Sequence, residues 1–221
     1  MASIEEALAL YEDAETGQSI QALAVSGGTR TNDWRPSCPT VVPSKYARSR
    51  QHGETITPWE LRALAIHEAK IHEVPPYLFL AIISAESCWN LNALGKAREI
   101  SLVQMLHSTY ADLREQGLVK GNPWHPKTNL HAGAVYLRQI IESFTKRELT
   151  LAYRTLGLSP YAVVAASYNA GPTAVKEAIT GHRELPASTL AYVQAVRELS
   201  KREKVLLEKT RQLKRTSHKI Q

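Results

Sequence analysis

An uninterrupted apolar stretch, residues 76–85, constrains the fold of this chain more than any other segment. Pro75 precedes it and Pro76 begins it, and the ten residues after them contain neither glycine nor proline. Proline is well tolerated in the first turn of a helix, so the pattern predicts a helix that begins at the second proline. Phe79, Ile82 and Ile83 are spaced three and four residues apart, and Glu86 continues the spacing. The sequence therefore predicts a buried helix with a carboxylate on its apolar face.

A carboxylate on an apolar helix face loses hydration, which favours its protonated form and raises its pKa. Glu86 is then expected to hold a proton near neutral pH, as a general acid requires. The alternative is a glutamate at a helix end that simply reaches water, which is common in proteins. The motifs that follow in the chain favour the acid.

Three further segments carry polar and aromatic residues in a recognisable order. The first begins at Glu86 as Glu-Ser-Cys-Trp-Asn-Leu-Asn-Ala and is followed by Gln104, eighteen residues after Glu86. The other two are residues 129–137, Asn-Leu-His-Ala-Gly-Ala-Val-Tyr-Leu, and residues 166–172, Ala-Ser-Tyr-Asn-Ala-Gly-Pro. Together they resemble the motifs of the soluble (SLT-type) lytic transglycosylases, which read Glu-Ser-x-Phe-Asn-Pro-x-Ala, Gly-Leu-Met-Gln, Asn-x-x-x-Gly-x-x-Tyr-Leu and Ala-Tyr-Asn-Ala-Gly. The resemblance covers about residues 74–180.

This family has a goose-type lysozyme-like helical fold and cleaves bacterial cell-wall glycan, and the resemblance implies both for this chain. It implies that one glutamate, here Glu86, first protonates the glycosidic oxygen. The same residue, now a base, takes the proton from the 6-hydroxyl of the N-acetylmuramic residue, which closes an anhydro ring. Hydrolytic glycosidases usually pair two carboxylates about 5 to 9 Å apart instead. The implied enzyme needs no metal, nucleotide or other cofactor.

The resemblance also assigns roles to residues around the acid. The hydroxyl of Tyr168 is expected to approach and orient Glu86, and Asn169 to help hold the saccharide. The other substrate-binding residues expected along the cleft are Ser87, Trp89 and Gln104. From the residues alone, a tryptophan suits the apolar face of a sugar ring or packs in a core. A glutamine within an apolar run is either a buried amide with partners or a substrate hydrogen-bonding group.

Two departures from the family pattern precede Gln104. Gly95 stands where the family often has a serine, and Arg98-Glu99-Ile100-Ser101 replaces a Gly-Ala-x-Gly stretch. Glu99 thereby becomes a candidate second acid, which would make the enzyme a muramidase that hydrolyses with water. The alternative for Glu99 is a solvated ion pair with Arg98. Two further alternatives are a peptidoglycan endopeptidase, as in some phage lysins, and a virion structural protein that keeps the fold to bind glycan.

Other motif residues have structural interpretations. Asn129 is expected to cap the helix that follows it, and the pair Ala132 and Gly133 to let another backbone approach. Gly171 is expected to form a turn between two helices, with Pro172 as the first residue of the second.

The cysteines and histidines indicate no metal site. Cys38 and Cys88 either form a disulfide or remain apart, and the sequence leaves both open. Cys88 is also open to interpretation as a nucleophile or as a packing residue. His67 and His72 are one residue too far apart for the His-Glu-x-x-His zinc helix, so we expect no metal.

The remaining patterns predict a mainly α fold with at most a small β element. Thr57, Pro58 and Glu60 form a helix-start signature, with Thr57 as the cap. Further helices are expected at about residues 3–15, 108–116, 128–144, 148–156, 160–168 and 173–180, with one or two from residue 186 onward. We expect three parts: an N-terminal helix and arm (1–57), a lysozyme-like catalytic domain (58–185) and a basic helical extension (186–221).

Composition and charge limit where in the cell this chain is expected to act. Its 221 residues are 43% hydrophobic, and no stretch approaches the roughly 20 apolar residues of a membrane span. The first six residues are acidic where an export signal would be basic. These features predict no stable membrane insertion and no ordinary export. A wall enzyme of this kind suggests a phage-encoded protein, virion-associated or held in the host cytoplasm before release to the periplasm and cell wall.

The net charge of +6 is concentrated in the helical extension from residue 186. Its basic face either attracts the anionic bacterial envelope or belongs to a solvated helix packed on the core. No motif in the sequence supports nucleic-acid binding. The expected partners are peptidoglycan glycan strands, with virion or envelope proteins as further candidates.

Overall fold

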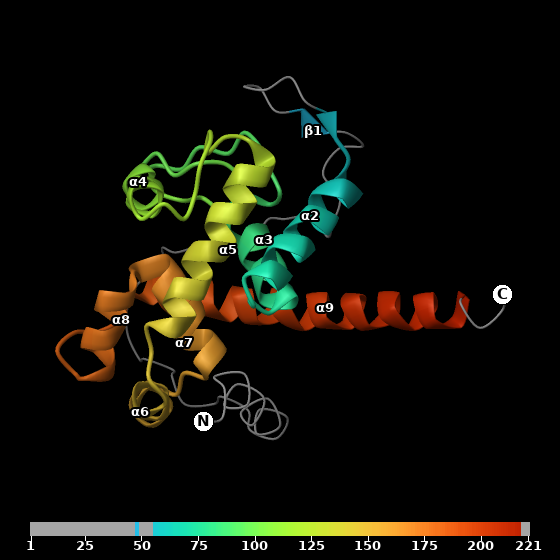
Figure 1. The fold of residues 1–221 in the computed structure, drawn as a ribbon. Helices are drawn as coiled ribbons and strands as arrows, with labels where there is room; N and C mark the ends of the chain where they lie inside the picture. Colours follow the sequence, from blue (N-terminus) through green and yellow to red (C-terminus); the bar gives the residue numbers. More distant parts are fainter. Residues whose placement is uncertain (1–46, 49–54, 218–221) are drawn as a thin grey trace. The chain divides into compact units, whose positions relative to one another are not determined.

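A computed structural model describes residues 47–48 and 55–217 of the protein (Figure 1). The expected helix at residues 3–15, most of the N-terminal arm and Cys38 lie outside the described residues. Most of the described residues lie in helices and very few lie in strands, which confirms the mainly α prediction. A short antiparallel pair is the small β element of the described residues, with Ala47 opposite Ile56.

The elements follow one another closely in the sequence. They are β1 Ala47–Arg48, β2 Thr55–Ile56, α2 Pro58–Ile71, α3 Pro76–Ser87, α4 His107–Glu115, α5 Pro126–Glu142, α6 Lys146–Leu156, α7 Pro160–Ala170, α8 Pro172–Ile179 and α9 Ala187–Ser217. The helices expected between residues 57 and 180 are therefore confirmed, with ends that differ by a few residues at most. The C-terminal residues form one long helix, α9, within the described range.

Capping explains where α2 begins. The hydroxyl of Thr57 accepts a hydrogen bond from the Glu60 backbone N–H at 3.2 Å, and the Glu60 carboxylate accepts the Thr57 backbone N–H at 2.8 Å. The bond from the Thr57 N–H, and a second one from the Thr57 hydroxyl at 2.7 Å, hold the pKa of the Glu60 carboxyl below its usual value. Thr145 and Glu148 repeat the arrangement at the start of α6. Each pair satisfies backbone donors that a helix start otherwise leaves unpaired.

The described residues divide into two compact units, and each is described by itself. Unit 1 contains residues 142–193, and unit 2 contains residues 47–48, 55–141 and 194–217. Residues 187–193 of α9 belong to unit 1, and the rest of the helix belongs to unit 2.

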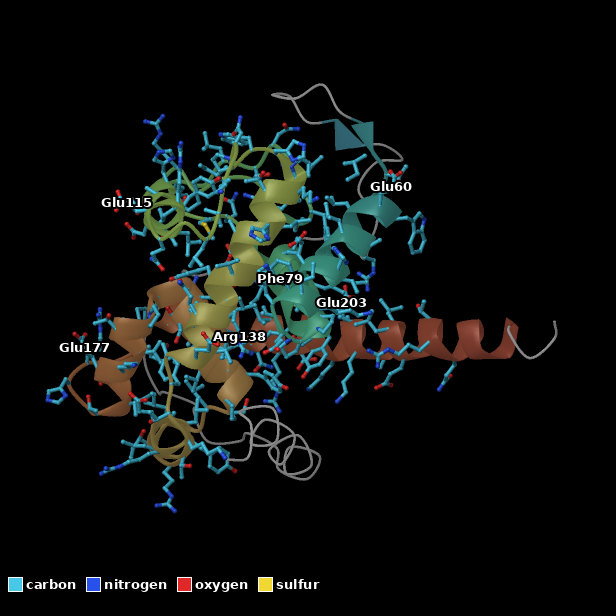
Figure 2. All side chains as sticks on the ribbon, viewed as in Figure 1. Glu60, Phe79, Glu115, Arg138, Glu177 and Glu203 are labelled. Atoms are coloured by element: carbon cyan, nitrogen blue, oxygen red, sulfur yellow. The ribbon has the colours of Figure 1, made fainter. Side chains whose placement is uncertain are left out.

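The core of unit 2 is built around α3. Phe79, Ile82 and Ile83 are fully buried, as their spacing predicted, and α2 packs beside α3 (Figure 1; Phe79 is labelled in Figure 2). Leu61 of α2 and Leu130 of α5 are equally buried. Burying one such side chain contributes roughly 1.5 to 3 kcal/mol, so these residues fix α3 firmly in the unit.

The part of α9 that belongs to unit 2 is packed on α2 and α3. Glu203, which is labelled in Figure 2 and only 4% exposed, accepts two hydrogen bonds from the guanidinium of Arg62 on α2. The Lys204 ammonium lies 5.8 Å from the centre of the Tyr77 ring of α3. These contacts support the interpretation of the basic segment as a helix packed on the core. No helix of the described residues combines the length and apolar character that a membrane crossing needs.

Unit 1 is a cluster of α6, α7 and α8, which pack against one another (Figure 1). Gly171 separates α7 from α8 with φ of 87°, and Pro172 is the first residue of α8. Glycine adopts this left-handed region without a steric cost, which confirms the predicted turn. The Lys176 ammonium anchors α8 by donating to the Ser143 carbonyl at 2.6 Å.

Candidate active site

Glu86 lies in the last turn of α3, and its side chain is half-buried. The helix ends directly after it, because Cys88 adopts the left-handed conformation and its N–H bonds the Ser84 carbonyl. Ser87 donates its hydroxyl to the Ile83 carbonyl at 3.2 Å, so that hydroxyl is engaged on its own helix. The carboxyl group therefore lies at the end of a largely buried helix of unit 2.

Trp89 is fixed against the same helix turn. Its indole N–H donates to the Ser84 hydroxyl at 2.8 Å, and that hydroxyl donates to the Leu80 carbonyl at 2.9 Å. Trp89 itself has φ of 64°, which folds the chain back toward α3. The ring remains partly exposed rather than buried in the core. An aromatic surface is therefore held beside the turn that carries Glu86.

The segment from residue 90 to residue 106 folds back on itself. Ile100 pairs with both Leu94 and Met105 in isolated antiparallel bridges. Ser101 ties the two sides together, since its N–H bonds the Ala93 carbonyl at 2.8 Å and its hydroxyl bonds the Leu91 carbonyl at 2.8 Å. We call residues 90–106 the Gln104 loop.

Arg98 and Ser101 replace two glycines of the family pattern, yet the backbone keeps a conformation that suits glycine. Arg98 has φ of 66° and Ser101 has φ of 58°. A residue with a side chain costs about 1 to 2 kcal/mol in this region relative to the right-handed one. The pairing of the Gln104 loop therefore imposes this geometry without the help of glycine.

Gln104 is bonded inside its own loop. Its amide nitrogen donates to the Ser101 carbonyl at 2.7 Å and to the Ala93 carbonyl at 3.3 Å. Both amide hydrogens are thus used, as the buried-amide interpretation expects. The Oε1 atom is the part of this side chain suited to accept a hydrogen bond from a sugar hydroxyl.

Glu99 is held in a tight turn beside Gly95. Its carboxylate accepts the Ala97 backbone N–H at 2.9 Å. Among the ion pairs of the described residues none joins Glu99 to Arg98, so the expectation of a solvated ion pair is wrong. A Cβ placed on Gly95 would overlap the Glu99 carboxylate and lie 2.9 Å from Gln104 Oε1. The carboxylate therefore fills the space into which a residue 95 side chain would project.

Asn129 secures the Gln104 loop from α5. Its side-chain oxygen accepts the Val103 N–H at 3.1 Å, and its amide nitrogen donates to the carbonyls of Ile100 at 3.2 Å and Pro123 at 3.0 Å. The expected capping role is wrong, because Asn129 lies inside the first turn of α5 and bonds another segment. The structural role is confirmed: a 1% exposed amide holds the segment that ends in Gln104.

Gly133 allows a close approach, as expected, but to a side chain rather than to a backbone. A Cβ at this position would lie 2.7 Å from Cγ1 of the buried Val103. The Gln104 loop therefore contacts α5 in two places. Asn129 forms hydrogen bonds with it, and the absence of a side chain at Gly133 leaves room for Val103.

Tyr168 and Asn169 belong to unit 1, at the end of α7. Tyr168 is half-buried and Asn169 is exposed. The Asn169 oxygen accepts the Thr189 hydroxyl at 2.9 Å, which fixes the amide and leaves its nitrogen hydrogens for a ligand. The orientation of Glu86 by Tyr168 stays a prediction, since the two residues belong to different units.

The structure brings some expected residues together and adds others. Glu86, Ser87 and Trp89 share one helix end, and Glu99 and Gln104 lie in the loop that follows it. Sequence reasoning missed Ser84, which holds Trp89, and Thr189, which holds Asn169, and it named Asn129 without its partners in the Gln104 loop. Cys88 is in a disulfide, which excludes a thiol nucleophile at this position.

A separate group of described residues has the chemistry of metal ligands: Glu68 and His72 on α2 and its C-cap, with His131 of α5. Sequence reasoning considered His67 and His72 and missed the carboxylate and the third ligand. The local signal for this group was the i,i+4 spacing of Glu68 and His72, which places the two side chains next to each other on a helix.

Known proteins resemble this chain in sequence and in fold. The family model described as the transglycosylase SLT domain matches residues 63–190. The structure is similar to an inactive mutant of lytic transglycosylase Slt from Pseudomonas aeruginosa, with a TM-score of 0.54 and 23% identity over 66% of this chain and 24% of that one. It is also similar to the 70 kDa soluble lytic transglycosylase from Escherichia coli, with a TM-score of 0.52 and 21% identity over 68% of this chain and 25% of that one.

At these identities the two structures establish the fold, and this chain spans about a quarter of each. Among curated protein sequences, none matches it. The family model nevertheless covers more than half of the chain, and it contains the whole segment from α3 to α8. The chain therefore belongs to the family of transglycosylase SLT domains.

Proposed function

We propose that this protein cleaves the glycan strands of bacterial peptidoglycan as a lytic transglycosylase, with Glu86 as its single acid and base. The observation that carries the proposal is the position of Glu86. It lies half-buried at the end of a buried helix, three residues before an aromatic side chain and a loop that is held in place. One of the similar structures, that of an inactive mutant in which a glutamate is replaced by glutamine, supports a glutamate as the essential group in that protein.

The proposed reaction needs two proton transfers at Glu86. The protonated carboxyl group gives its proton to the oxygen that links N-acetylmuramic acid to N-acetylglucosamine, and the bond from C1 to that oxygen breaks. The resulting carboxylate takes the proton of the 6-hydroxyl of the same muramic residue, and the 6-oxygen bonds C1. Glu86 ends protonated, no water is consumed, and the nucleophile is already part of the substrate.

The setting of Glu86 suits an acid that starts in the protonated form. Partial burial disfavours a charged carboxylate. The carbonyl oxygens at the end of α3 carry the negative end of the helix dipole, which disfavours an anion there as well.

Four further side chains, two in each unit, have the chemistry to bind a sugar chain or assist Glu86. The half-exposed Trp89 ring, held by Ser84, offers an apolar face to a pyranose ring. Gln104 Oε1 is suited to accept from a sugar hydroxyl, and the amide hydrogens of Asn169 are suited to bond an N-acetyl carbonyl. We assign the Tyr168 hydroxyl to the orientation of Glu86.

A second candidate function is hydrolysis by a muramidase in which Glu99 activates water. The half-buried carboxylate beside Gln104 favours it. The hydrogen bond that Glu99 accepts from the Ala97 N–H argues instead for a structural carboxylate that stabilises its own turn. We therefore assign Glu99 to the support of the loop.

Substitution of Glu86 by Gln tests the proposal with little change in shape. Glu86→Gln should abolish the clearing of a peptidoglycan suspension and keep the co-sedimentation of the protein with the wall. Glu115→Gln, at the exposed end of α4, is the matched control and should clear the suspension normally (Figure 2). Clearing by Glu86→Gln at the wild-type rate would refute the single-acid mechanism.

The Glu99→Gln variant separates the two candidate functions. It should clear the suspension at a rate similar to that of the wild-type protein, because an amide oxygen still accepts the Ala97 N–H. Complete loss of clearing by a folded Glu99→Gln protein would favour the muramidase.

A further inference from the structure

Three potential ligand atoms converge between α2 and α5 in unit 2. His72 Nε2 lies 3.2 Å from His131 Nδ1, and His131 Nδ1 lies 3.0 Å from Glu68 Oε2. His72 Nε2 and Glu68 Oε2 are 3.8 Å apart. We call Glu68, His72 and His131 the His–Glu cluster.

These spacings fit one small cation bound by all three atoms. Nitrogen and carboxylate ligands bind zinc at about 2.0 to 2.2 Å in a tetrahedron, which places neighbouring ligand atoms roughly 3.4 Å apart. The three separations, 3.0, 3.2 and 3.8 Å, lie around that value. The set of two imidazoles and one carboxylate is one that zinc sites use when a fourth position is left to water.

The hydrogen bond of the second His131 nitrogen determines which ring nitrogen offers its lone pair to the cluster. His131 Nε2 lies 3.2 Å from the Leu118 carbonyl oxygen, so this nitrogen must carry a hydrogen to make that bond. In a neutral ring Nδ1 is then unprotonated, and its lone pair faces the Glu68 carboxylate, another acceptor. Metal-binding histidines commonly donate their outer N–H to a backbone carbonyl in this way.

A shared proton would pair the three ligand atoms of the cluster less completely than a metal cation would. If His131 were doubly protonated, its single Nδ1 hydrogen could form a full hydrogen bond with Glu68 or with His72, but not with both. His72 Nε2 faces the same two atoms, 3.2 Å from His131 Nδ1 and 3.8 Å from Glu68 Oε2, and it offers a lone pair to the cluster when the ring hydrogen lies on Nδ1.

We propose that the His–Glu cluster binds one divalent transition-metal ion of the zinc class. The Glu68 side chain is 3% exposed, whereas those of His72 and His131 are 21% and 34% exposed, so the site is closed on the carboxylate side and open to water on the imidazole side. Imidazole and carboxylate ligands suit zinc, cobalt or nickel better than calcium or magnesium, which prefer oxygen ligands alone.

The bound ion would tie three segments of unit 2 together. It joins the C-terminal end of α2 to α5 and, through the His131 ring, to Leu118. His131 stands two residues after Asn129, the residue that holds the Gln104 loop. The ion would therefore stiffen the start of the helix on which that loop depends.

Metal content of the untagged full-length protein tests the proposal directly. After incubation with Zn²⁺ and dialysis, elemental analysis should find about one zinc per chain. Competition with a chromophoric chelator should then show that His72→Ala and His131→Ala each weaken zinc binding by at least about 100-fold. His67→Ala, an exposed histidine of the same helix, is the matched control and should bind as the wild-type protein does.

A second measurement keeps the test independent of folding. Co²⁺ bound to the wild-type protein should give the visible absorption bands of a four-coordinate ion, and Glu68→Gln should weaken these bands while circular dichroism confirms its helices. A wild-type protein that retains no zinc would overturn the proposal. Equal binding by the wild-type, His72→Ala and His131→Ala proteins would overturn it as well.

Discussion

Replacement of Asn129 by alanine tests how the Gln104 loop is held. The side chain makes three hydrogen bonds, one with the Val103 N–H and two with the carbonyls of Ile100 and Pro123. A net contribution of about 1 kcal/mol for each bond gives a loss of about 3 kcal/mol in the free energy of unfolding. Asn129 is 1% exposed, so water cannot replace the lost partners without rearrangement, and the loss could reach about 5 kcal/mol.

Urea unfolding followed by far-UV circular dichroism measures this loss. Asn122→Ala is the matched control, because exposed Asn122 makes a single side-chain bond, accepted from the Trp124 N–H. We expect the control to lose less than about 1 kcal/mol, in the usual range for an exposed polar residue. The slope of the free energy with urea should be similar in all three proteins, which would show that the unfolded state is unchanged.

A loss of less than about 1 kcal/mol in Asn129→Ala would refute the argument, since it would mean that the three bonds contribute nothing net. The activity of the variant gives a second outcome. If Asn129 positions the Gln104 loop, kcat/KM on peptidoglycan should fall under conditions in which the variant is fully folded. A destabilised variant that keeps the wild-type kcat/KM would show that Asn129 stabilises the protein without positioning the Gln104 loop. That result would contradict the expected fall in activity.

Three further predictions concern other residues. Gly95→Ser should slow wall clearing, because its side chain would overlap the Glu99 carboxylate, and adding Glu99→Ala should restore clearing; an equally slow double variant would contradict this coupling. Bonds to Thr145 hold the pKa of Glu148 below its usual value of 4.5, so its stabilisation is present above about pH 4.5 and is lost as pH falls through the folded pKa. The unfolding temperature should therefore be measured between about pH 3 and 6, and it should fall less with acid in Glu148→Gln than in the wild-type protein. An equal fall in both proteins would contradict the stabilising role of the Glu148 carboxylate. Thr189→Val should release the Asn169 amide, which we propose binds glycan, and weaken co-sedimentation with the wall; unaltered binding by the folded variant would contradict this assignment.

Features that depend on residues close in sequence could be predicted. The spacing of Phe79, Ile82 and Ile83 identified the buried face of α3 and placed Glu86 at its end. The capping box of Thr57 and Glu60 is a pattern of four consecutive residues, and the structure contains both of its hydrogen bonds. Such signals are local, because neighbours on a helix are three or four residues apart.

Features that depend on distant residues could not be predicted in this way. Asn129 was interpreted as a helix cap because a cap is the local use of asparagine, whereas its partners lie 26 and 29 residues away in the Gln104 loop. Arg62 and Glu203 are 141 residues apart, and no local pattern pairs them. The same applies to Glu68 and His131, whose meeting depends on the packing of α2 against α5.

The loop backbone shows a third limit of sequence reasoning. Arg98 and Ser101 adopt positive φ without glycine, so the usual residue signal for that conformation is missing. The bonds of Ser101 to Ala93 and Leu91 supply the constraint instead.

The central claim is that one glutamate carries both proton transfers, and the chemical nature of the glycan ends tests it most directly. Purified peptidoglycan digested with the wild-type protein should be analysed by mass spectrometry of the released fragments. We predict muramic ends closed as 1,6-anhydro rings, one water lighter than ordinary ends, and none in a digest with Glu86→Gln. Reducing muramic ends formed by the wild-type protein would contradict the account, because they require a water molecule that the proposed reaction does not consume.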